Sequence, residues 1–80
     1  MTRPRLPVTG AWFRTKRNAA RLPTTDPRIT SIIAQATLSR FERGSGRIEL
    51  YDAAELCDLY GVELGQLLDM IRAELAGKFP

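Results

Sequence analysis

Residues 35–44, QATLSRFERG, constrain the fold of this chain more than any other segment of its sequence. Wound as an α-helix at about 100° per residue, the run separates into two faces. Leu38 and Phe41 form a core face, and the opposite face is short-chained, rich in donors and free of acids, carrying Gln35, Ala36, Ser39, Arg40 and Arg43. Gly44 follows as a typical helix stop. Such a face belongs either to an ordinary solvated surface helix or to a helix slim enough to enter the DNA major groove, where Gln, Ser and Arg read bases.

Charge is divided unevenly along the chain. Residues 1–47 hold ten of the twelve Lys and Arg residues and only two acids, which gives a net charge of +8. Residues 48–80 hold the other two basic residues and seven acids, which gives −5, so the two parts sum to the net +3 of the whole chain. A basic half that contains residues 35–44 is typical of a polyanion-binding face. Acidic ligands or a membrane surface also suit such a patch, but no segment pairs this charge with a long apolar helical face.

Composition limits the classes of protein to which the chain can belong. Its 80 residues, 44% of them hydrophobic, predict one folded domain. The single cysteine, Cys57, excludes an internal disulfide framework and suits a reducing cytoplasm. Because the chain has no histidine, a zinc site or a common nucleophile–base pair is hard to assemble, and no apolar run is long enough to span a bilayer. The sequence therefore predicts neither an enzyme nor a cofactor or metal site, and no small-molecule ligand is evident.

Apolar spacing predicts an all-α fold, a compact bundle of about five short helices. We expect residues 1–9 to form an extended basic arm, residues 10–76 the domain, and residues 77–80 a short tail. The prolines at positions 4 and 7 are the reason that no helix is expected to start within the arm.

Start and stop signals place the individual helices. Thr9 is the expected cap of a first helix over residues 10–21, and Asp26 with Pro27 begins a second. The third is the helix over residues 35–43, and Gly44-Ser45-Gly46 is expected to be a flexible loop. Asp52 and Glu55 are predicted to form a capping box at the start of a fourth helix, which ends before Gly61. A fifth helix is predicted over residues 64–76 and is expected to end at Gly77.

The same spacing defines the core faces of these helices, and one face holds a charge. The expected core positions are Phe13, Arg17, Ala20, Ile29, Ile32, Ile33, Leu38, Phe41, Ala53, Leu56, Cys57, Tyr60, Leu64, Leu67, Leu68, Ile71 and Leu75. Arg17 lies within a buried stripe, and Glu42 lies on the border of the face made by Leu38. Two charges that face one core are tolerated mainly as a pair. We therefore expect an Arg17–Glu42 ion pair, the alternative being that both side chains reach solvent.

Two segments carry a family resemblance. LSRFERG at residues 38–44 and AELCDLYGV at residues 54–62 resemble the end of the recognition helix and the fourth helix of the lambda-repressor/Cro-like helix-turn-helix family, also called Xre. An ungapped match runs back from Leu38 to Gly10, so the resemblance covers roughly residues 10–70. Residues 56–62 are similar to regulators of high-GC Gram-positive bacteria and their phages. The family implies DNA binding through residues 35–43, and it often pairs a first-helix arginine with a recognition-helix glutamate, here Arg17 and Glu42.

The chain departs from the family pattern at two places. Pro27-Arg28 stands where members usually carry Leu-Ala, and Ile32 stands where the turn usually has glycine. Because proline breaks a helix interior, the second helix should begin about one turn late. Without the glycine, the turn should be tighter or partly helical. These departures put in doubt the contacts that the resemblance implies for Thr24 and Thr25.

Candidate contact residues follow from the chemistry of each side chain. Gln35 resembles the family's base-reading glutamine and can pair with adenine, Arg40 can reach a guanine, and Ala36 can meet a thymine methyl or simply keep the helix slim. Candidate phosphate ligands, which position the protein without specifying sequence, are Thr37, Ser39, Arg43, Arg47, Thr25 and Arg28. Arg3 and Arg5 either enter a minor groove or remain in a solvated tail.

The resulting hypothesis is a sequence-specific, double-stranded DNA-binding transcriptional regulator of a bacterium or phage, in the cytoplasm at the nucleoid. We expect a repressor that binds a palindromic operator as a homodimer. An antitoxin or anti-regulator that binds mainly protein remains an alternative. So does an excisionase-like architectural protein, which would require a two-stranded wing. The expected dimer interface is in the acidic half, at Met70, Ile71, Leu75 and Phe79, unless Met70 and Phe79 fold back over the domain's own core.

Overall fold

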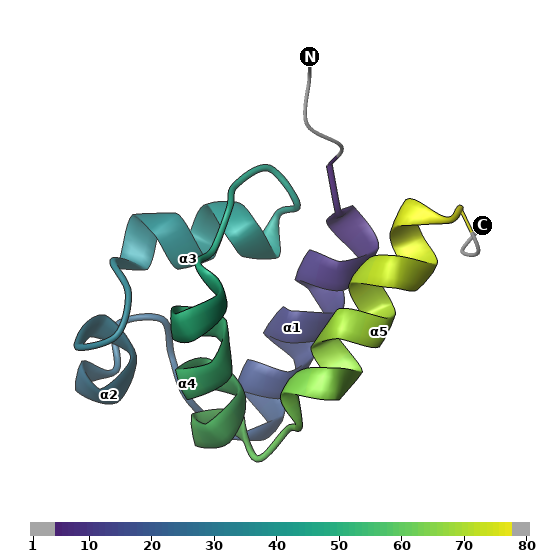
Figure 1. Ribbon diagram of the computed structural model, residues 1–80. Coiled ribbons are helices and arrows are strands. Elements are labelled where there is room, and N and C mark those ends of the chain that lie inside the picture. Colours follow the sequence, from purple (N-terminus) through teal and green to yellow (C-terminus); the bar gives the residue numbers. More distant parts are fainter. Residues whose placement is uncertain (1–4, 78–80) are drawn as a thin grey trace.

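The computed structural model describes residues 5–77 and folds them into five helices. These are α1 (Pro7–Ala19), α2 (Pro27–Thr30), α3 (Gln35–Glu42), α4 (Leu50–Tyr60) and α5 (Leu64–Leu75). No strand occurs between residues 5 and 77, so the predicted all-α class is confirmed. α1 and α5 lie side by side, while α2 and α3 lie on the opposite side of the molecule from α5 (Figure 1).

One core joins all five helices. Phe13 of α1 is fully buried, and its ring lies edge-on to Phe41 of α3 at 5.5 Å and beside Tyr60 of α4 at 5.1 Å between ring centroids. Leu67 of α5 is also buried and belongs to the same cluster. Burial of one large apolar side chain contributes about 1.5–3 kcal/mol, so this cluster fixes the position of α3 against the rest of the bundle. Most of the predicted core positions are buried, but Leu68 and Leu75 are exposed.

The start of α2 and the turn before α3 confirm their predictions. The Asp26 carboxylate accepts a hydrogen bond of 2.9 Å from the Arg28 N–H, and Pro27 is the first helical residue. After Thr30 the chain continues in a hydrogen-bonded turn, in which the Ile33 N–H donates to the Ile29 carbonyl at 3.0 Å. No residue of this turn has a positive φ, which explains why isoleucine can occupy position 32.

The start of α1 corrects two expectations. The helix begins at Pro7, within the expected arm, and Thr9 is a fully buried helical residue and not the cap. The Val8 and Thr9 N–H groups each donate to a carboxylate oxygen of Glu74 in α5, at 2.7 Å. Partial burial acts to raise the pKa of Glu74, but these hydrogen bonds outweigh it and lower the pKa below its usual value. A distant carboxylate thus satisfies the free amides at the start of α1, which local signals cannot predict.

The expected capping box of α4 is also wrong. The helix begins at Leu50, with Glu49 as the capping residue, and no side chain makes a cap hydrogen bond there. Asp52 lies inside the first turn, where its charge still favours the helix dipole. The ends of α4 and α5 follow the prediction, since Gly61 and Gly77 adopt positive φ values of 72° and 70°.

Gly10 allows α1 to approach the end of α3, and its replacement tests that packing. A Cβ at position 10 would lie 2.5 Å from the Phe41 carbonyl oxygen and 2.6 Å from that of Glu42. We expect Gly10→Ala to lower the free energy of unfolding by about 1–3 kcal/mol, because overpacking against backbone outweighs alanine's better helix propensity. Urea-unfolding midpoints measure the effect.

Gly65→Ala is the matched control. Gly65 also lies in a helix, but an added Cβ there has no neighbour within 4 Å. This variant is expected to gain up to about 1 kcal/mol. If both alanine variants were equally stable, the close contact between α1 and α3 would be contradicted.

Candidate nucleic-acid interface

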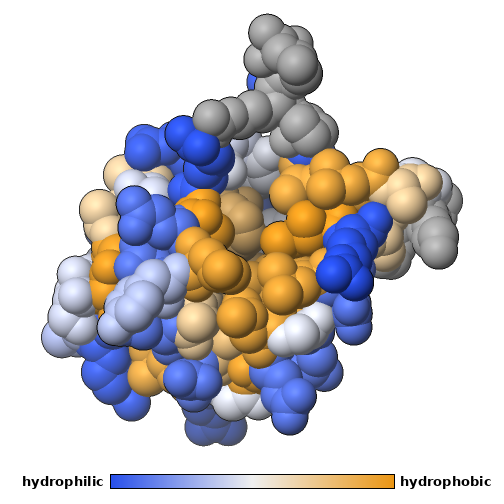
Figure 2. All heavy atoms as spheres, in the orientation of Figure 1, coloured by the Kyte–Doolittle hydropathy of each residue, from blue (hydrophilic) through white to orange (hydrophobic). Residues whose placement is uncertain are grey.

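The two faces predicted for α3 are present in the structure. Leu38 and Phe41 are buried in the core, with exposures of 0% and 4%. Gln35, Ala36 and Arg40 are exposed, as is Arg43 directly after the helix, and Thr37 and Ser39 are half-buried at the edges. In Figure 2, apolar atoms gather over α5, whereas hydrophilic and apolar atoms are mixed on the side that carries α3. The core therefore holds α3 by one face and leaves its polar face free.

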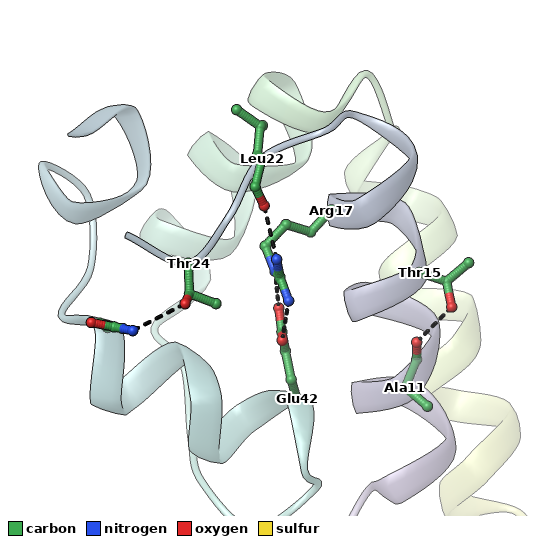
Figure 3. Close-up of polar contacts among 7 residues, drawn as sticks. Ala11, Thr15, Arg17, Leu22, Thr24 and Glu42 are labelled. Atoms are coloured by element: carbon green, nitrogen blue, oxygen red, sulfur yellow. Dashed lines mark hydrogen bonds and ion pairs between the residues drawn. The ribbon is translucent and has the colours of Figure 1, made fainter. Parts of the chain in front are cut away.

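The predicted Arg17–Glu42 ion pair is confirmed (Figure 3). Arg17 Nε donates to Glu42 Oε2 at 2.7 Å, and Nη2 donates to Oε1 at 2.9 Å. Arg17 Nη1 donates to the Leu22 carbonyl oxygen at 2.8 Å. The hydrogen bond to Glu42 raises the pKa of the guanidinium above its usual value. A bidentate pair with this geometry joins α1, α3 and the segment that follows α1.

Glu42 is the only acid in α3, and this pairing has an electrostatic consequence. Its carboxylate is turned inward, since the Glu42 side chain is only 5% exposed. The exposed charges of α3 and its following turn are therefore those of Arg40 and Arg43. The outer face of α3 is polar and positive.

A contact that the sequence did not predict orients Gln35 at the start of α3. The Gln35 Nε2 group donates to Thr24 Oγ1 at 3.1 Å, across the segment that contains α2 (Figure 3). An amide carries two N–H donors and one carbonyl acceptor. One N–H and the oxygen therefore stay free for a donor–acceptor pair on a ligand. The only sequence signal for this contact was the family position of Thr24, which the unusual Pro27 had put in doubt.

The loop after α3 is bonded to the helix, contrary to the expected flexible linker. The Ser45 and Gly46 N–H groups donate to the Arg40 carbonyl at 3.0 and 3.2 Å. Gly44 adopts a φ of 81°, and its carbonyl accepts a hydrogen bond of 3.1 Å from the Leu6 N–H. This bond holds Leu6 against the loop, and Leu6 directly follows Arg5. Arg5 is exposed, and so is Arg47 at the end of the loop. Three candidate contacts, Arg5, Arg43 and Arg47, lie at this end of α3, while Arg3 lies outside the described residues.

The remaining phosphate candidates differ in their surroundings, and both of their arginines have acidic neighbours. Thr25 is exposed, and Arg28 pairs with Asp26 through hydrogen bonds of 3.1 and 3.2 Å. Thr37 and Arg47 line a groove of about 510 Å³ that Glu49 and Asp52 also line. The carboxylates in that groove weaken the positive field around Arg47 without forming an ion pair with it. Arg40 lies in α3, and Arg43 directly follows the helix. Neither arginine forms an ion pair with an acid within residues 5–77.

Comparisons with protein-family models, with curated proteins and with solved structures found no match for this chain. Within residues 5–77, no three His, Cys, Asp or Glu side chains are grouped so that they could hold a metal ion. None of the helices in this range combines the length and the apolar composition needed to cross a membrane.

Removing Glu42 tests how far the fold depends on the ion pair. Glu42→Ala leaves the Arg17 guanidinium, whose side chain is 10% exposed, without its counter-ion. Breaking such a buried pair typically costs about 3–5 kcal/mol, and we expect a loss of this size in urea unfolding at neutral pH. Replacing both partners, by Arg17→Met with Glu42→Leu, should recover most of the loss because no buried charge remains.

Arg28→Ala is the control for this experiment. It breaks an ion pair in which the Arg28 side chain is 65% exposed, and exposed pairs contribute little to stability. We expect almost no change in the urea midpoint. A Glu42→Ala chain as stable as Arg28→Ala would argue against a structural role for the buried pair.

Proposed function

We propose that this chain is a sequence-specific, double-stranded DNA-binding transcriptional regulator of the lambda-repressor/Cro-like helix-turn-helix type, that it acts as a repressor, and that α3 reads the major groove. The observation that carries the proposal is the outer face of α3. Its exposed residues are small, amide or basic, and its one acid is buried and paired. A helix enters the major groove only if its outer face is slim, and it reads bases if that face presents amide and guanidinium groups.

The arrangement of Gln35 and Arg40 supports base reading. Gln35 is held by Thr24 at the start of α3, with one N–H and the carbonyl oxygen free, and these are the groups that pair with adenine N7 and N6. Arg40 lies five residues later, on the same exposed face. Its guanidinium can make two hydrogen bonds to a guanine. Ala36 lies beside Gln35, where a small side chain suits a thymine methyl.

Phosphate binding and site size complete the proposal. Arg43 and Arg47 follow α3, where their charges suit the DNA backbone, with Ser39 and Thr37 at the edges of the helix. The eight residues of α3 are about 12 Å long, so one helix reads few base pairs. Proteins of this kind commonly bind as twofold pairs to half-sites about 34 Å apart. We therefore propose a homodimer on a palindromic operator.

Two other functions make different demands on the structure. An excisionase-like protein would use a two-stranded wing, whereas residues 43–49 contain no strand. An antitoxin or anti-regulator that binds protein would not need an acid-free, basic face on α3. Selection of bound duplexes from a random pool tests the proposal directly. We expect one enriched palindromic sequence, and recovery of unrelated sequences would favour a protein-binding role.

Replacement of the two proposed base-reading residues is the sharper test. Gln35→Ala and Arg40→Ala are each expected to lose about 1–3 kcal/mol of binding free energy on the selected duplex and to relax preference at one base position. Arg72→Ala is the control, because Arg72 is an exposed arginine on α5, away from α3. Equal losses on every sequence would mean that Gln35 and Arg40 contact only phosphate.

Salt dependence tests the phosphate contacts separately. The slope of log affinity against log salt is about −0.9 per phosphate contact on duplex DNA. Arg43→Ala and Arg47→Ala should each make the slope shallower by roughly one contact, with little change in sequence preference. Arg72→Ala should leave the slope unchanged. Binding that is insensitive to salt would contradict a basic contact face.

A further inference from the structure

A groove of about 320 Å³ lies where the loop after α3, the residue before α1 and the end of α5 meet. Its lining residues are Leu6, Phe41, Gly44, Ser45, Gly46, Arg47, Ile48, Ile71 and Leu75. Five of them are large and apolar, two are glycines, and the single charge is that of Arg47. Pockets that bind small molecules are of this size or larger, are mostly apolar, and hold a few polar groups that orient the ligand. The groove therefore has the composition of a ligand site.

Close contacts fix the loop side of the groove. The Leu6 N–H donates to the Gly44 carbonyl at 3.1 Å, and a Cβ at position 44 would lie 2.6 Å from Pro7 Cα. The Gly46 N–H donates to the Arg40 carbonyl at 3.2 Å, and a Cβ at position 46 would lie 2.8 Å from Arg40 Cβ. The opposite wall belongs to α5. Both walls are thus held in place without a ligand, and binding to a preformed site avoids much of the cost of ordering the protein.

Apolar surface and one cation remain uncovered in this groove. Leu75 is 55% exposed, and Figure 2 shows apolar atoms over α5. Arg47 is exposed and forms no ion pair with an acid between residues 5 and 77. No acid is among the lining residues, whereas Glu49 and Asp52 line the other groove that Arg47 borders. The charge that lines the groove beside α5 is therefore positive, and a molecule with an apolar body and a negative group complements it.

We propose that this groove binds a small amphipathic carboxylate, a free acid with an apolar tail of medium length. The tail covers Ile71 and Leu75, and the carboxylate accepts hydrogen bonds from the Arg47 guanidinium, whose planar fork matches two carboxylate oxygens. Ser45, the other polar side chain in the lining, already donates its hydroxyl proton to the Arg40 carbonyl at 3.3 Å. Arg47 is therefore the group that selects an anion.

The site links a ligand to the proposed DNA contact. Arg47 is a proposed phosphate ligand, and a carboxylate that pairs with its guanidinium takes the donors that a DNA phosphate needs. We expect the bound acid to weaken DNA binding by roughly one phosphate contact. This consequence rests on the proposed function, whereas binding of the acid does not.

Titration of the whole chain with sodium octanoate, kept below the concentration at which it forms micelles, tests the proposal without DNA. Backbone amide resonances should shift saturably in residues 44–48 and 71–75. Octan-1-ol carries the same apolar tail without charge, and octylammonium reverses the charge. Each is expected to bind about tenfold more weakly, because it lacks the charge-assisted bond to Arg47. Equal affinity for the three probes, or no saturable shift with octanoate, would overturn the proposal.

Two substitutions separate the charge from the apolar surface. Arg47→Gln should weaken octanoate binding by about tenfold and leave octan-1-ol binding unchanged. Leu75→Gln should weaken the binding of both probes, because both use the apolar wall. Arg72→Gln is the matched control, since Arg72 is an exposed arginine of α5 that does not line the groove. Circular dichroism should show all chains equally helical, and an Arg47→Gln chain with wild-type affinity for octanoate would also overturn the proposal.

Other occupants of the groove give different results. Ile71 and Leu75 belong to the dimer interface expected from the sequence, so shifts of the groove residues on dilution without octanoate would assign the groove to a second copy. Cosedimentation with vesicles of phosphatidylcholine and oleate, without binding of free octanoate, would assign it to a lipid surface. Either result overturns the proposal.

Binding to the selected duplex tests the effect of the acid on DNA affinity. Octanoate should make the slope of log affinity against log salt shallower by about one contact in the wild type and not in Arg47→Gln. An unchanged slope with octanoate bound would overturn the link to DNA binding. If the random pool yields no preferred sequence while octanoate still binds, the DNA proposal fails and the carboxylate site stands.

Discussion

Arg17 and Glu42 form a buried ion pair, and the packing of α3 against α1 depends on this pair. Their bidentate contact, with the third bond from Arg17 to the Leu22 carbonyl, joins α1, α3 and the chain between α1 and α2. Removal of either charge alone would leave the other buried, which is far more costly than exchange of both for apolar groups. The pair therefore specifies how α3 sits on α1 as well as helping to hold it there.

The same contact shapes the surface. Because Glu42 turns inward, α3 presents no acid to solvent, and the positive charge of Arg40 and Arg43 is left unopposed on its outer side. At the other end of the molecule, α5 exposes leucines. The loop of residues 44–48 lies between these regions, bonded to the Arg40 carbonyl and lining the groove beside α5. The same short segment thus adjoins both the polar face of α3 and the exposed leucines of α5.

Sequence patterns predicted most of the fold because most of its elements are set by local rules. Apolar spacing gave the buried faces of α3 and α4, Asp26 with Pro27 gave the start of α2, and glycines gave the ends of α4 and α5. The predictions for Thr9 and Asp52 were wrong because each residue fits a local capping rule, whereas Leu6 and Glu49 are the residues at the N-cap positions of α1 and α4. α1 begins earlier than expected, at Pro7, and the free amides of Val8 and Thr9 in its first turn donate to Glu74, a carboxylate at least 65 residues away. The exposure of Gln35, Ala36, Arg40 and Arg43 and the Arg17–Glu42 pair also follow the sequence prediction, but the contact of Gln35 with Thr24 was not predicted.

The sequence by itself determined most of the residues that face the core, with Leu68 and Leu75 as exceptions. It also determined that the charges of Arg17 and Glu42 had to pair and which side of α3 stays polar. The faces of a helix follow from its period, which relates residues only a few positions apart. The need for a pair follows from the cost of burying a charge, which any charged residue on a core face incurs. Only the tertiary structure decided that Glu74 caps α1, that Thr24 holds Gln35, and that Leu6, Phe41 and Leu75 enclose a groove. Each of these contacts joins segments whose relative position depends on the angles at which whole helices pack. Such angles result from the fit of many side chains at once, and no local pattern in the sequence encodes them.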